Sequence, residues 1–228
     1  MLIGLAAVII LIVIIASING TSSADDDPES APSASEPAAE PSAEPDPVES
    51  EEPEPPAAPA VERQEWSGTG DMVIDANITA PATVWFNCNP CESNTVLETN
   101  GRESLLVNTI GSYTGKRLIN VNDGSVVTRF TITASGPWQL VVEDLSTAKS
   151  VARAASGAGD DVILMTDEFD VASITNDGSS NFVVYAYGEG NFSPLIVNEI
   201  GAYSGTVPMV GPAFVEVTST GNWTITPQ

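Results

Sequence analysis

The sequence has no histidine, and its 228 residues include only two cysteines. Without an imidazole, the chain cannot form a Ser-His-Asp triad, a Cys-His pair or a histidine-ligated zinc site. Two cysteines are also too few for a four-cysteine zinc site within one chain. We therefore predict no catalytic residue, no metal site and no cofactor, and we expect that the protein is not an enzyme.

Basic residues are scarce as well: seven stand against 31 acidic residues, which gives a formal net charge of −24. Such a chain repels phosphate backbones, so nucleic acid is excluded as a partner. Carboxylates such as Asp160, Asp161 and Asp177 could in principle hold calcium or cleave glycosides. The chain lacks the Asp-x-Asp-x-Asp-Gly spacing of a calcium loop, so a solvated surface is the simpler interpretation. A carboxylate-based hydrolase stays as an alternative function.

Residues 1–20 contain the one long apolar run, from Leu2 to Ile18, interrupted only by Gly4 and Ser17. As a helix this run is about 26 Å long, close to the thickness of a bilayer core. We predict an uncleaved, single-pass signal anchor in the cell membrane, with everything downstream outside the cytoplasm. The alternative is a signal peptide that is cleaved near Ala24, which would release a secreted protein.

Residues 21–65 consist almost entirely of Ala, Pro, Ser, Asp and Glu, with no aromatic residue before Trp66. Such a segment buries too little apolar surface to offset its ordering entropy, so we predict a disordered linker. Its repeated proline steps and like charges favour extended conformations, with a reach of at most roughly 140 Å at about 3.1 Å per residue.

From Trp66 onward the sequence changes to short β-rich runs bounded by Gly, Asn, Asp and Pro. We predict two antiparallel β-sandwich domains, Ig-like or jelly-roll-like, over residues 66–144 and 156–228. Residues 145–155 would join them as a plain linker or as a short helix capped by Ser146. The fold class is therefore all-β: two tandem sandwiches after one transmembrane helix and a disordered linker. The predicted strands are 72–75, 82–87, 94–99, 104–109, 118–121, 126–134 and 138–142, then 162–165, 171–175, 181–187, 193–198, 206–209, 214–218 and 223–226.

Three sequence landmarks recur in the same order in both regions, roughly 85 to 90 residues apart, which indicates a duplicated module. A Ser-Gly-x-Gly-Asp opening spans residues 67–71 and 156–160. An Ile-Gly-x-Tyr-Ser/Thr-Gly motif and a Gly-x-Trp-x-aliphatic ending follow it in each region. The structural signature comprises Gly111, Tyr113, Gly115 and Trp138 in the first region, and Gly201, Tyr203, Gly205 and Trp223 in the second.

We expect both glycines of the Gly-x-Tyr-x-Gly motif to adopt positive φ angles at a tight connection. Tyr113 and Tyr203 would then lie against the sandwich edge, with the hydroxyl bonded to nearby backbone as in a tyrosine corner. The alternative is an exposed aromatic ring that stacks on a sugar. Trp138 and Trp223 are expected in the cores.

Trp85 and Phe86 have no aromatic counterparts in the second region, where our alignment places Ala172 and Ser173. Adjacent residues of a strand point to opposite faces, so one of the two rings could be exposed. They are candidate binding aromatics, and a filler between the modules is the alternative.

Tyr185 and Tyr187 are the other candidate binding aromatics, because they share one face of a predicted strand. The same two alternatives apply to them, a ligand surface or a filler between the modules.

Cys88 and Cys91 lie in a Cys-Asn-Pro-Cys segment at a predicted hairpin, whose counterpart is the ordinary turn 175–178. Outside the membrane we predict a disulfide between them. A redox Cys-x-x-Cys is the alternative, but the strand–helix–strand setting that such motifs usually occupy is absent.

The repeated frame, with Asn181-Phe-Val-Val and Leu195-Ile-Val-Asn-Glu-Ile-Gly-Ala-Tyr-Ser-Gly, resembles an uncharacterised tandem β-sandwich repeat of Gram-positive-type bacterial envelope proteins, which are membrane-anchored or secreted. The resemblance covers residues 156–226 well and 67–142 less well, since Thr95 stands in the place of Phe182. It implies the fold and an envelope location, and it brings no activity or functional residues.

Taken together, these patterns predict a membrane-anchored extracytoplasmic protein that displays two β-sandwich modules for binding or structural roles at the envelope. Its partners would be the membrane, through the N-terminal helix, and an envelope polysaccharide or protein. An accessory subunit of another membrane protein is the main alternative.

Overall fold

The structure is a computed structural model that describes residues 61–188 and 195–228. The predicted anchor and nearly all of the predicted linker lie outside these residues. Within the described part of the chain, no helix is both long and apolar enough to cross a membrane. All described residues belong to a single compact unit of the chain.

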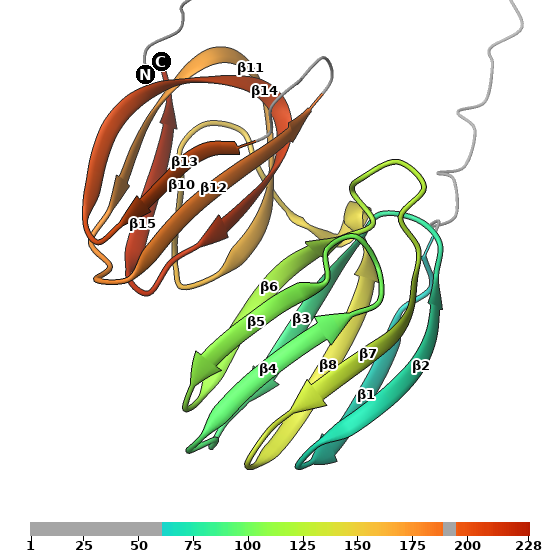
Figure 1. The fold of residues 1–228 in the computed structure, drawn as a ribbon. Helices are drawn as coiled ribbons and strands as arrows, with labels where there is room; N and C mark the ends of the chain where they lie inside the picture. Colours follow the sequence, from blue (N-terminus) through green and yellow to red (C-terminus); the bar gives the residue numbers. More distant parts are fainter. Residues whose placement is uncertain (1–60, 189–194) are drawn as a thin grey trace, which may run out of the picture. The chain divides into compact units, whose positions relative to one another are not determined.

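The prediction of an all-β fold with antiparallel sheets is confirmed (Figure 1). In the described residues, a 3-10 helix η1 (Leu145–Thr147) is the one helical element. The strands before it are β1 (Gln64–Thr69), β2 (Met72–Ile78), β3 (Ala82–Cys88), β4 (Asn94–Thr99), β5 (Leu105–Ile110), β6 (Tyr113–Ile119), β7 (Val127–Thr133) and β8 (Pro137–Asp144). The strands after it are β9 (Lys149–Val151), β10 (Ala155–Ala158), β11 (Asp161–Asn176), β12 (Asn181–Gly188), β13 (Leu195–Ile200), β14 (Tyr203–Thr218) and β15 (Asn222–Pro227).

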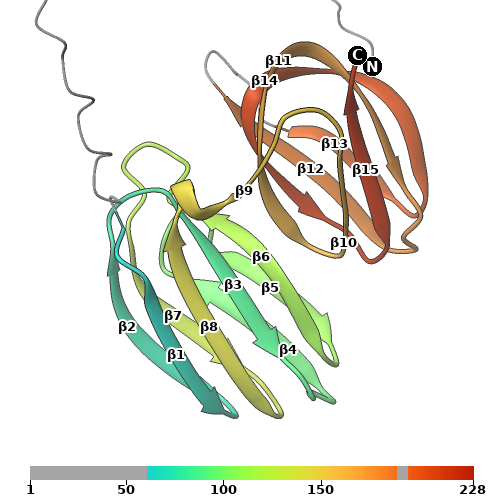
Figure 2. The same ribbon diagram turned by 180° about the vertical axis from the view of Figure 1, so that it is seen from behind.

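The first half of the described chain, from β1 to β8, forms two four-stranded antiparallel sheets around one core. Their orders are β1-β8-β3-β6 and β2-β7-β4-β5, and the first sheet is seen in Figure 2. Strand alternation supplies the core, because every second side chain points inward. Fully buried residues such as Phe86, Phe130 and Leu140 fill the space between the sheets.

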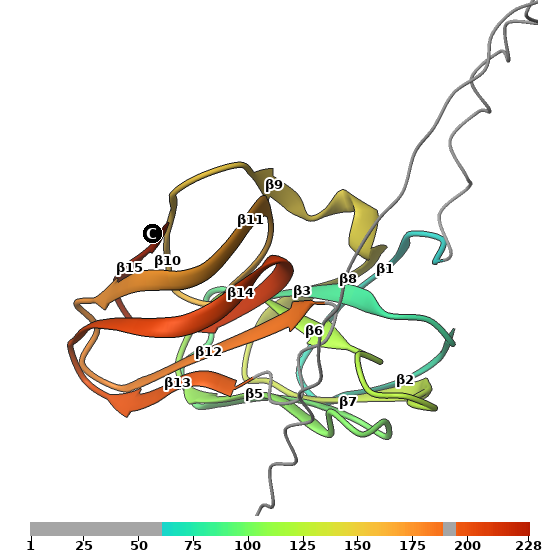
Figure 3. The same cartoon turned by 90° about the horizontal axis from the view of Figure 1, so that it is seen from above.

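The second half, from β9 to β15, forms one sheet in the order β10-β15-β11-β14-β12-β13, with β9 parallel to β11. It encloses a separate core that contains Ile174, Phe182 and Trp223. β11 and β14 are 16 residues long and curve through this half (Figures 1 and 3). Because of this length, each takes part in both layers: the end of β11 pairs with β15, and the end of β14 pairs with β12.

The two halves have equivalent strand orders once two joins are allowed. β11 corresponds to β2 and β3 together, and β14 corresponds to β6 and β7 together. In the first half, residues 79–81 and 120–126 interrupt these strands. In the second half the β11–β14 pairing continues past register shifts around Phe169 instead. Such bulges bend a strand without ending it.

The predicted strand positions were wrong in three respects. The predicted strands 162–165 and 171–175 form one continuous strand, β11. The predicted strands 206–209 and 214–218 likewise form one strand, β14. β6 and β14 begin at Tyr113 and Tyr203, earlier than predicted. β1, β9 and β10 were missed: β9 and β10 are only three and four residues long, and β1 and β10 each contain a glycine, a residue that is depleted in strands.

In two of the missed strands, β1 and β10, a glycine makes room for the tryptophan of the ending motif. A Cβ atom on Gly68 would lie 2.4 Å from the ring of Trp138. Two residues later, Gly70 adopts a φ of 76°, and its carbonyl oxygen accepts the Trp138 indole N–H at 2.8 Å. The second half repeats this arrangement with Gly157, Gly159 and Trp223. The opening and ending motifs are therefore the two parts of one packing device.

The glycines of the Gly-x-Tyr-x-Gly motif have two different roles. Gly111 and Gly201 adopt φ angles of 93° and 90°, as a tight turn requires. Gly115 and Gly205 do not have positive φ angles, so that part of our prediction was wrong. They lie inside strands beneath the preceding tyrosine, and a Cβ atom there would lie 2.6 or 2.3 Å from its hydroxyl oxygen. The motif is a turn followed by a slot for an aromatic ring.

The segment between the halves is neither a plain linker nor a helix capped by Ser146. η1 is capped by Asp144, whose carboxylate accepts the Ser146 backbone N–H at 2.9 Å. β9 follows and pairs in parallel with the first residues of β11. The segment is thus hydrogen-bonded to both halves along its course.

Gly68→Ala should lower the free energy of unfolding by about 1 to 3 kcal/mol, because the added methyl group displaces the buried Trp138 ring. Ser67→Ala is the matched control. Ser67 precedes Gly68 and its side chain is exposed, so this substitution should change the free energy of unfolding by less than about 0.5 kcal/mol. Urea unfolding measures both. Equal stabilities for the two variants would contradict the packing role of Gly68.

Candidate functional site

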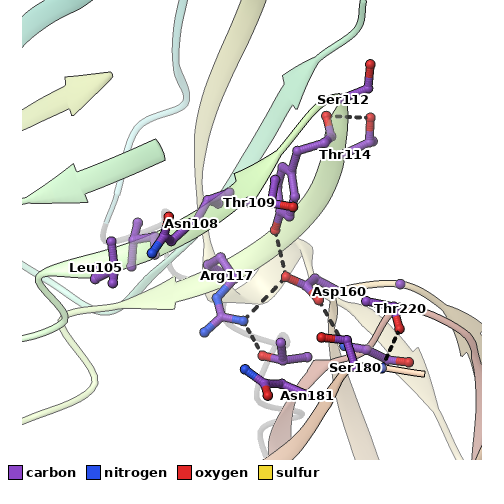
Figure 4. Close-up of a pocket in the computed structure, with 16 residues that line it drawn as sticks. Leu105, Asn108, Thr109, Ser112, Thr114, Arg117, Asp160, Ser180, Asn181 and Thr220 are labelled. Atoms are coloured by element: carbon purple, nitrogen blue, oxygen red, sulfur yellow. Dashed lines mark hydrogen bonds and ion pairs between the residues drawn. The ribbon is translucent and has the colours of Figure 1, made fainter. Parts of the chain in front are cut away.

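The candidate site lies where the two halves meet, around the side chain of Arg117. Its Nε lies 3.0 Å from Glu216 Oε1, and its Nη1 lies 3.5 Å from Asp160 Oδ2. Nη1 also donates a hydrogen bond to the Thr218 hydroxyl (Figure 4). All three partners belong to the second half, and the four side chains come from β6, β14 and the turn before β11. Arg117 therefore contacts three side chains of the second half.

Arg117 reaches the second half because β6 is the last strand of its sheet. In the register it lies opposite Val84, which faces the first core. At a sheet edge, a long side chain on this face can pass beyond the core instead of entering it. The outward backbone of β6 is covered in the same way: Lys116 N–H donates to the Asp160 carbonyl oxygen, and Leu118 N–H donates to Glu216 Oε1, both at 3.1 Å.

Asp160 uses its two carboxylate oxygens for different purposes. Oδ1 accepts the Ser219 backbone N–H at 2.9 Å, a contact within the second half. The equivalent Asp71 has the same kind of contact, with Ala134 N–H at 3.0 Å. Oδ2 of Asp160 accepts the Tyr113 hydroxyl at 2.9 Å and faces Arg117. The aspartate of the opening motif thus has a local role in both halves and a joining role in one.

The contact of Tyr113 corrects the prediction of a tyrosine corner. Its hydroxyl donates to a carboxylate of the other half and not to nearby backbone. Burial, and next the negative charge of Asp160, raise the pKa of Tyr113 well above its usual range, so the hydroxyl stays protonated as a donor.

The Arg117–Glu216 ion pair is largely shielded from solvent, with side chains 15% and 6% exposed, and this desolvation sets its electrostatics. Glu216 is 5% exposed, and desolvation raises its pKa although Arg117 opposes the shift. Burial alone would lower the pKa of Arg117, but the carboxylates of Glu216 and Asp160 outweigh it and raise that pKa. The Arg117 Nε–H is close to Glu216 but makes no aligned hydrogen bond. The cluster is therefore a compensated set of buried charges, in which the loss of one member is costly.

Each half also has the surface that its neighbour uses at the junction, and neither of these two equivalent surfaces carries the junction residues. Three residues of the junction are replaced there: Arg117 by Val207, Leu118 by Pro208 and Glu216 by Thr131. Proline has no backbone N–H, so the β14 edge lacks the donor that Leu118 supplies on β6. The junction is thus specific to the contact between these two halves.

Two hollows adjoin at Arg117, and we call them together the junction cleft. The larger has a volume of about 430 Å³ and lies between β5, β6 and the turns of the second half (Figure 4). The smaller has a volume of about 260 Å³ and is lined by residues that include Glu103, Tyr185, Tyr187 and Glu216. Leu105, Leu106 and Arg117 line both hollows.

Tyr185 and Tyr187, two of the predicted binding aromatics, line the smaller hollow. Their rings stack with centroids 6.0 Å apart and planes 19° apart. Both side chains are half-buried on the face of β12 that points away from the core. Burial, and next the charge of Glu216, raise the pKa of Tyr187, so its hydroxyl stays protonated.

Phe86 is not available to a ligand, because it is fully buried in the first core with its ring 6.1 Å from that of Tyr113. Trp85 is half-buried on the opposite face of the strand, between Lys116 and Val141 in the register. It lies on a different surface from that of the two tyrosines.

Our alignment of Phe86 with Ser173 was also displaced by one residue. Gly115 pairs with Phe86 and Gly205 pairs with Ile174, so Phe86 corresponds to Ile174. The ring that packs against the signature tyrosine therefore comes from a different strand in each half. It is Phe86 of β3 in the first, and in the second it is Phe182 of β12, 5.7 Å from Tyr203.

Cys88 and Cys91 form a disulfide beside the first core, and both are buried. Among residues 61–188 and 195–228, no group of three or more acidic or cysteine side chains could hold a metal ion. The predicted carboxylate clusters divide accordingly: Asp160 joins the halves, and Asp177 accepts both the backbone and the side-chain N–H of Asn222.

Sequence reasoning missed Arg117 and Glu216, because one charged residue in a β-rich run carries no motif. A signal was available in the duplication. The residue equivalent to Arg117 is the apolar Val207, and the one equivalent to Glu216 is the neutral Thr131. Opposite charges that appear once in each half, at positions that are neutral in the other half, indicate a contact between the halves.

Arg117→Met should lower the free energy of unfolding by about 3 to 5 kcal/mol, because it leaves Glu216 and Asp160 buried without their cation. Arg129→Met is the matched control: its ion pair with Asp75 is exposed, and its loss should cost less than about 0.5 kcal/mol. Adding Glu216→Gln to Arg117→Met should recover part of the loss. Similar urea unfolding curves for Arg117→Met and Arg129→Met would contradict this account.

Comparison with known proteins adds no relative to this picture. No protein-family model matches the chain, and a search of curated proteins finds no match. The resemblance to an envelope repeat therefore stays a prediction, and the function has to be argued from the junction itself.

Proposed function

We propose that the protein is a non-enzymatic, membrane-anchored protein of the cell envelope, whose two halves are tandem β-sandwich domains that act as one binding head. The N-terminal apolar run would hold the chain in the membrane, and the acidic linker would carry the head away from it. A tether of this kind raises the local concentration of the head near envelope components.

The observation that carries this proposal is the buried cluster around Arg117. Flexibly linked domains usually meet through small, polar surfaces. Here a largely shielded arginine, a buried glutamate and the outward edge of β6 find their partners across the junction. This favours a fixed pair of domains with a permanent cleft between them, and such clefts at domain interfaces are common ligand sites.

The carboxylates beside the cleft favour binding over hydrolysis. A glycosidase needs two carboxyl groups that are free to exchange protons or attack. Glu103 accepts hydrogen bonds from Asn120 N–H, Asn122 and Ser125. Glu216 is held by Leu118 N–H and Arg117. Both are committed to structure, so the hydrolase alternative has little support.

The membrane anchor can be tested with the full-length chain. Wild type should stay in the membrane pellet after carbonate washing, whereas Ile9→Asp combined with Ile14→Asp should release it, because two charges in the apolar run oppose insertion. N-terminal sequencing supplies the second readout. A mature chain that begins near Ala24, recovered from the medium, would contradict the anchor and favour secretion.

A protein partner is the second candidate function, and one repeated feature favours it. Ile110 and Ile200 are both 80% exposed at the ends of the edge strands β5 and β13, at equivalent positions of the duplicated motif. Exposed apolar residues on strand edges are typical of protein contacts.

Cross-linking on membranes tests this second function. A protein partner in constant ratio to the chain, lost in Ile110→Ser combined with Ile200→Ser, would support an accessory subunit. Retention of the same partner in this variant, or no cross-linked partner at all, would count against it.

A further inference from the structure

The junction cleft contains two amide side chains without a structural use. Asn108 on β5 and Asn181 at the start of β12 both line the larger hollow, and both are exposed. Neither side-chain amide has a hydrogen bond to another described residue. They come from different halves and lie on the two sides of Arg117 in Figure 4. Each amide offers a donor and an acceptor to a bound molecule.

The smaller hollow supplies aromatic faces next to these amides. Tyr185 and Tyr187 are already stacked, so their rings are held in place before any ligand arrives. An ordered aromatic face combined with amide and hydroxyl groups is suited to molecules that have both C–H faces and hydroxyl edges. Hydroxyl groups of Thr109 and Thr114 also line the larger hollow.

The charges of the cleft select against ionic ligands. Arg117 is neutralised by Asp160 and Glu216, so no free cation is available to an anion. Asp160 and Glu216 are already paired with Arg117, and Glu103 accepts hydrogen bonds from Asn120 N–H, Asn122 and Ser125, so a cation would have to displace existing partners. The net charge of −24 repels anions further. An uncharged, hydroxyl-rich molecule meets none of these penalties.

We propose that the junction cleft binds a segment of an uncharged oligosaccharide. The amides of Asn108 and Asn181 hydrogen-bond its hydroxyl groups, and Tyr185 supports the face of a sugar ring. A volume of about 430 Å³ for the larger hollow is within the range of small-molecule sites. The site requires both halves, because Asn108 comes from the first half, whereas Asn181 and the aromatic ring of Tyr185 come from the second. This inference rests on the proposed function and names the ligand class for it.

The test is isothermal titration calorimetry of the full-length protein in detergent with three neutral probes: cellotetraose, maltotetraose and tetra-N-acetylchitotetraose. At least one should bind, whereas anionic tetragalacturonate should not. Asn108→Ala should weaken binding roughly fivefold, as expected for one lost hydrogen bond. Asn198→Ala is the matched control, because it removes the equivalent exposed residue of β13 and should leave affinity unchanged.

Tyr185→Ala tests the aromatic face and should weaken binding roughly tenfold, because it removes the ring on which the sugar face would lie. Trp85→Ala tests the rival aromatic surface and should have no effect. Unfolding curves of each variant show whether it is folded, and Asn108→Ala is informative alone because that side chain is exposed.

Two results would overturn the inference: no binding of any neutral probe, or binding that is lost in Trp85→Ala or Asn198→Ala and retained in Asn108→Ala. If the chain is anchored in the membrane but no probe binds, the inference fails and the proposed location stands. If a probe binds at the cleft and the chain is secreted, the location fails and the inference stands.

Discussion

The arrangement of the two halves depends on one positive charge that is largely shielded from water, that of Arg117. Arg117 has left water at the edge of the first sandwich, and only carboxylates of the second half compensate it. Removing a charge from water costs several kcal/mol, and the cost is recovered only when the partners are held in place. Separation of the halves would also expose the Leu118 and Lys116 N–H groups on β6. Water can hydrogen-bond to these groups, so the loss of their partners costs less than the loss of the ion pair.

A duplicated module explains how this junction could form from few changes. The opening-motif aspartate, the signature tyrosine and the strand order are common to both halves, and each has a function within its own half. At the junction, the first half has Arg117 and the second half has Glu216, neither of which has a charged equivalent in the other half. The second carboxylate oxygen of Asp160 also accepts a hydrogen bond from the Tyr113 hydroxyl. The outer β14 edge has Val207 and Pro208 at the equivalent positions, so the same contact cannot continue beyond two halves.

Much of the fold could be predicted from the sequence, because strand alternation and turn residues are local signals. Two of the missed strands, β1 and β10, depend on distant contacts. Their glycines, Gly68 and Gly157, make room for Trp138 and Trp223, which lie far along the chain. The site was predicted only through Tyr185 and Tyr187, which share a strand face. Arg117, Asp160 and Glu216 meet because two halves dock, and no spacing within either half encodes that contact.

The central claim is that the Arg117 cluster holds the two halves as one rigid head. Double electron–electron resonance between spin labels at Thr69 in the first half and Thr226 in the second measures this directly, since both side chains are exposed. One narrow distance distribution is predicted for the wild type and a broad one for Arg117→Met. A broad distribution in the wild type, or an unchanged narrow one in Arg117→Met, would contradict the account.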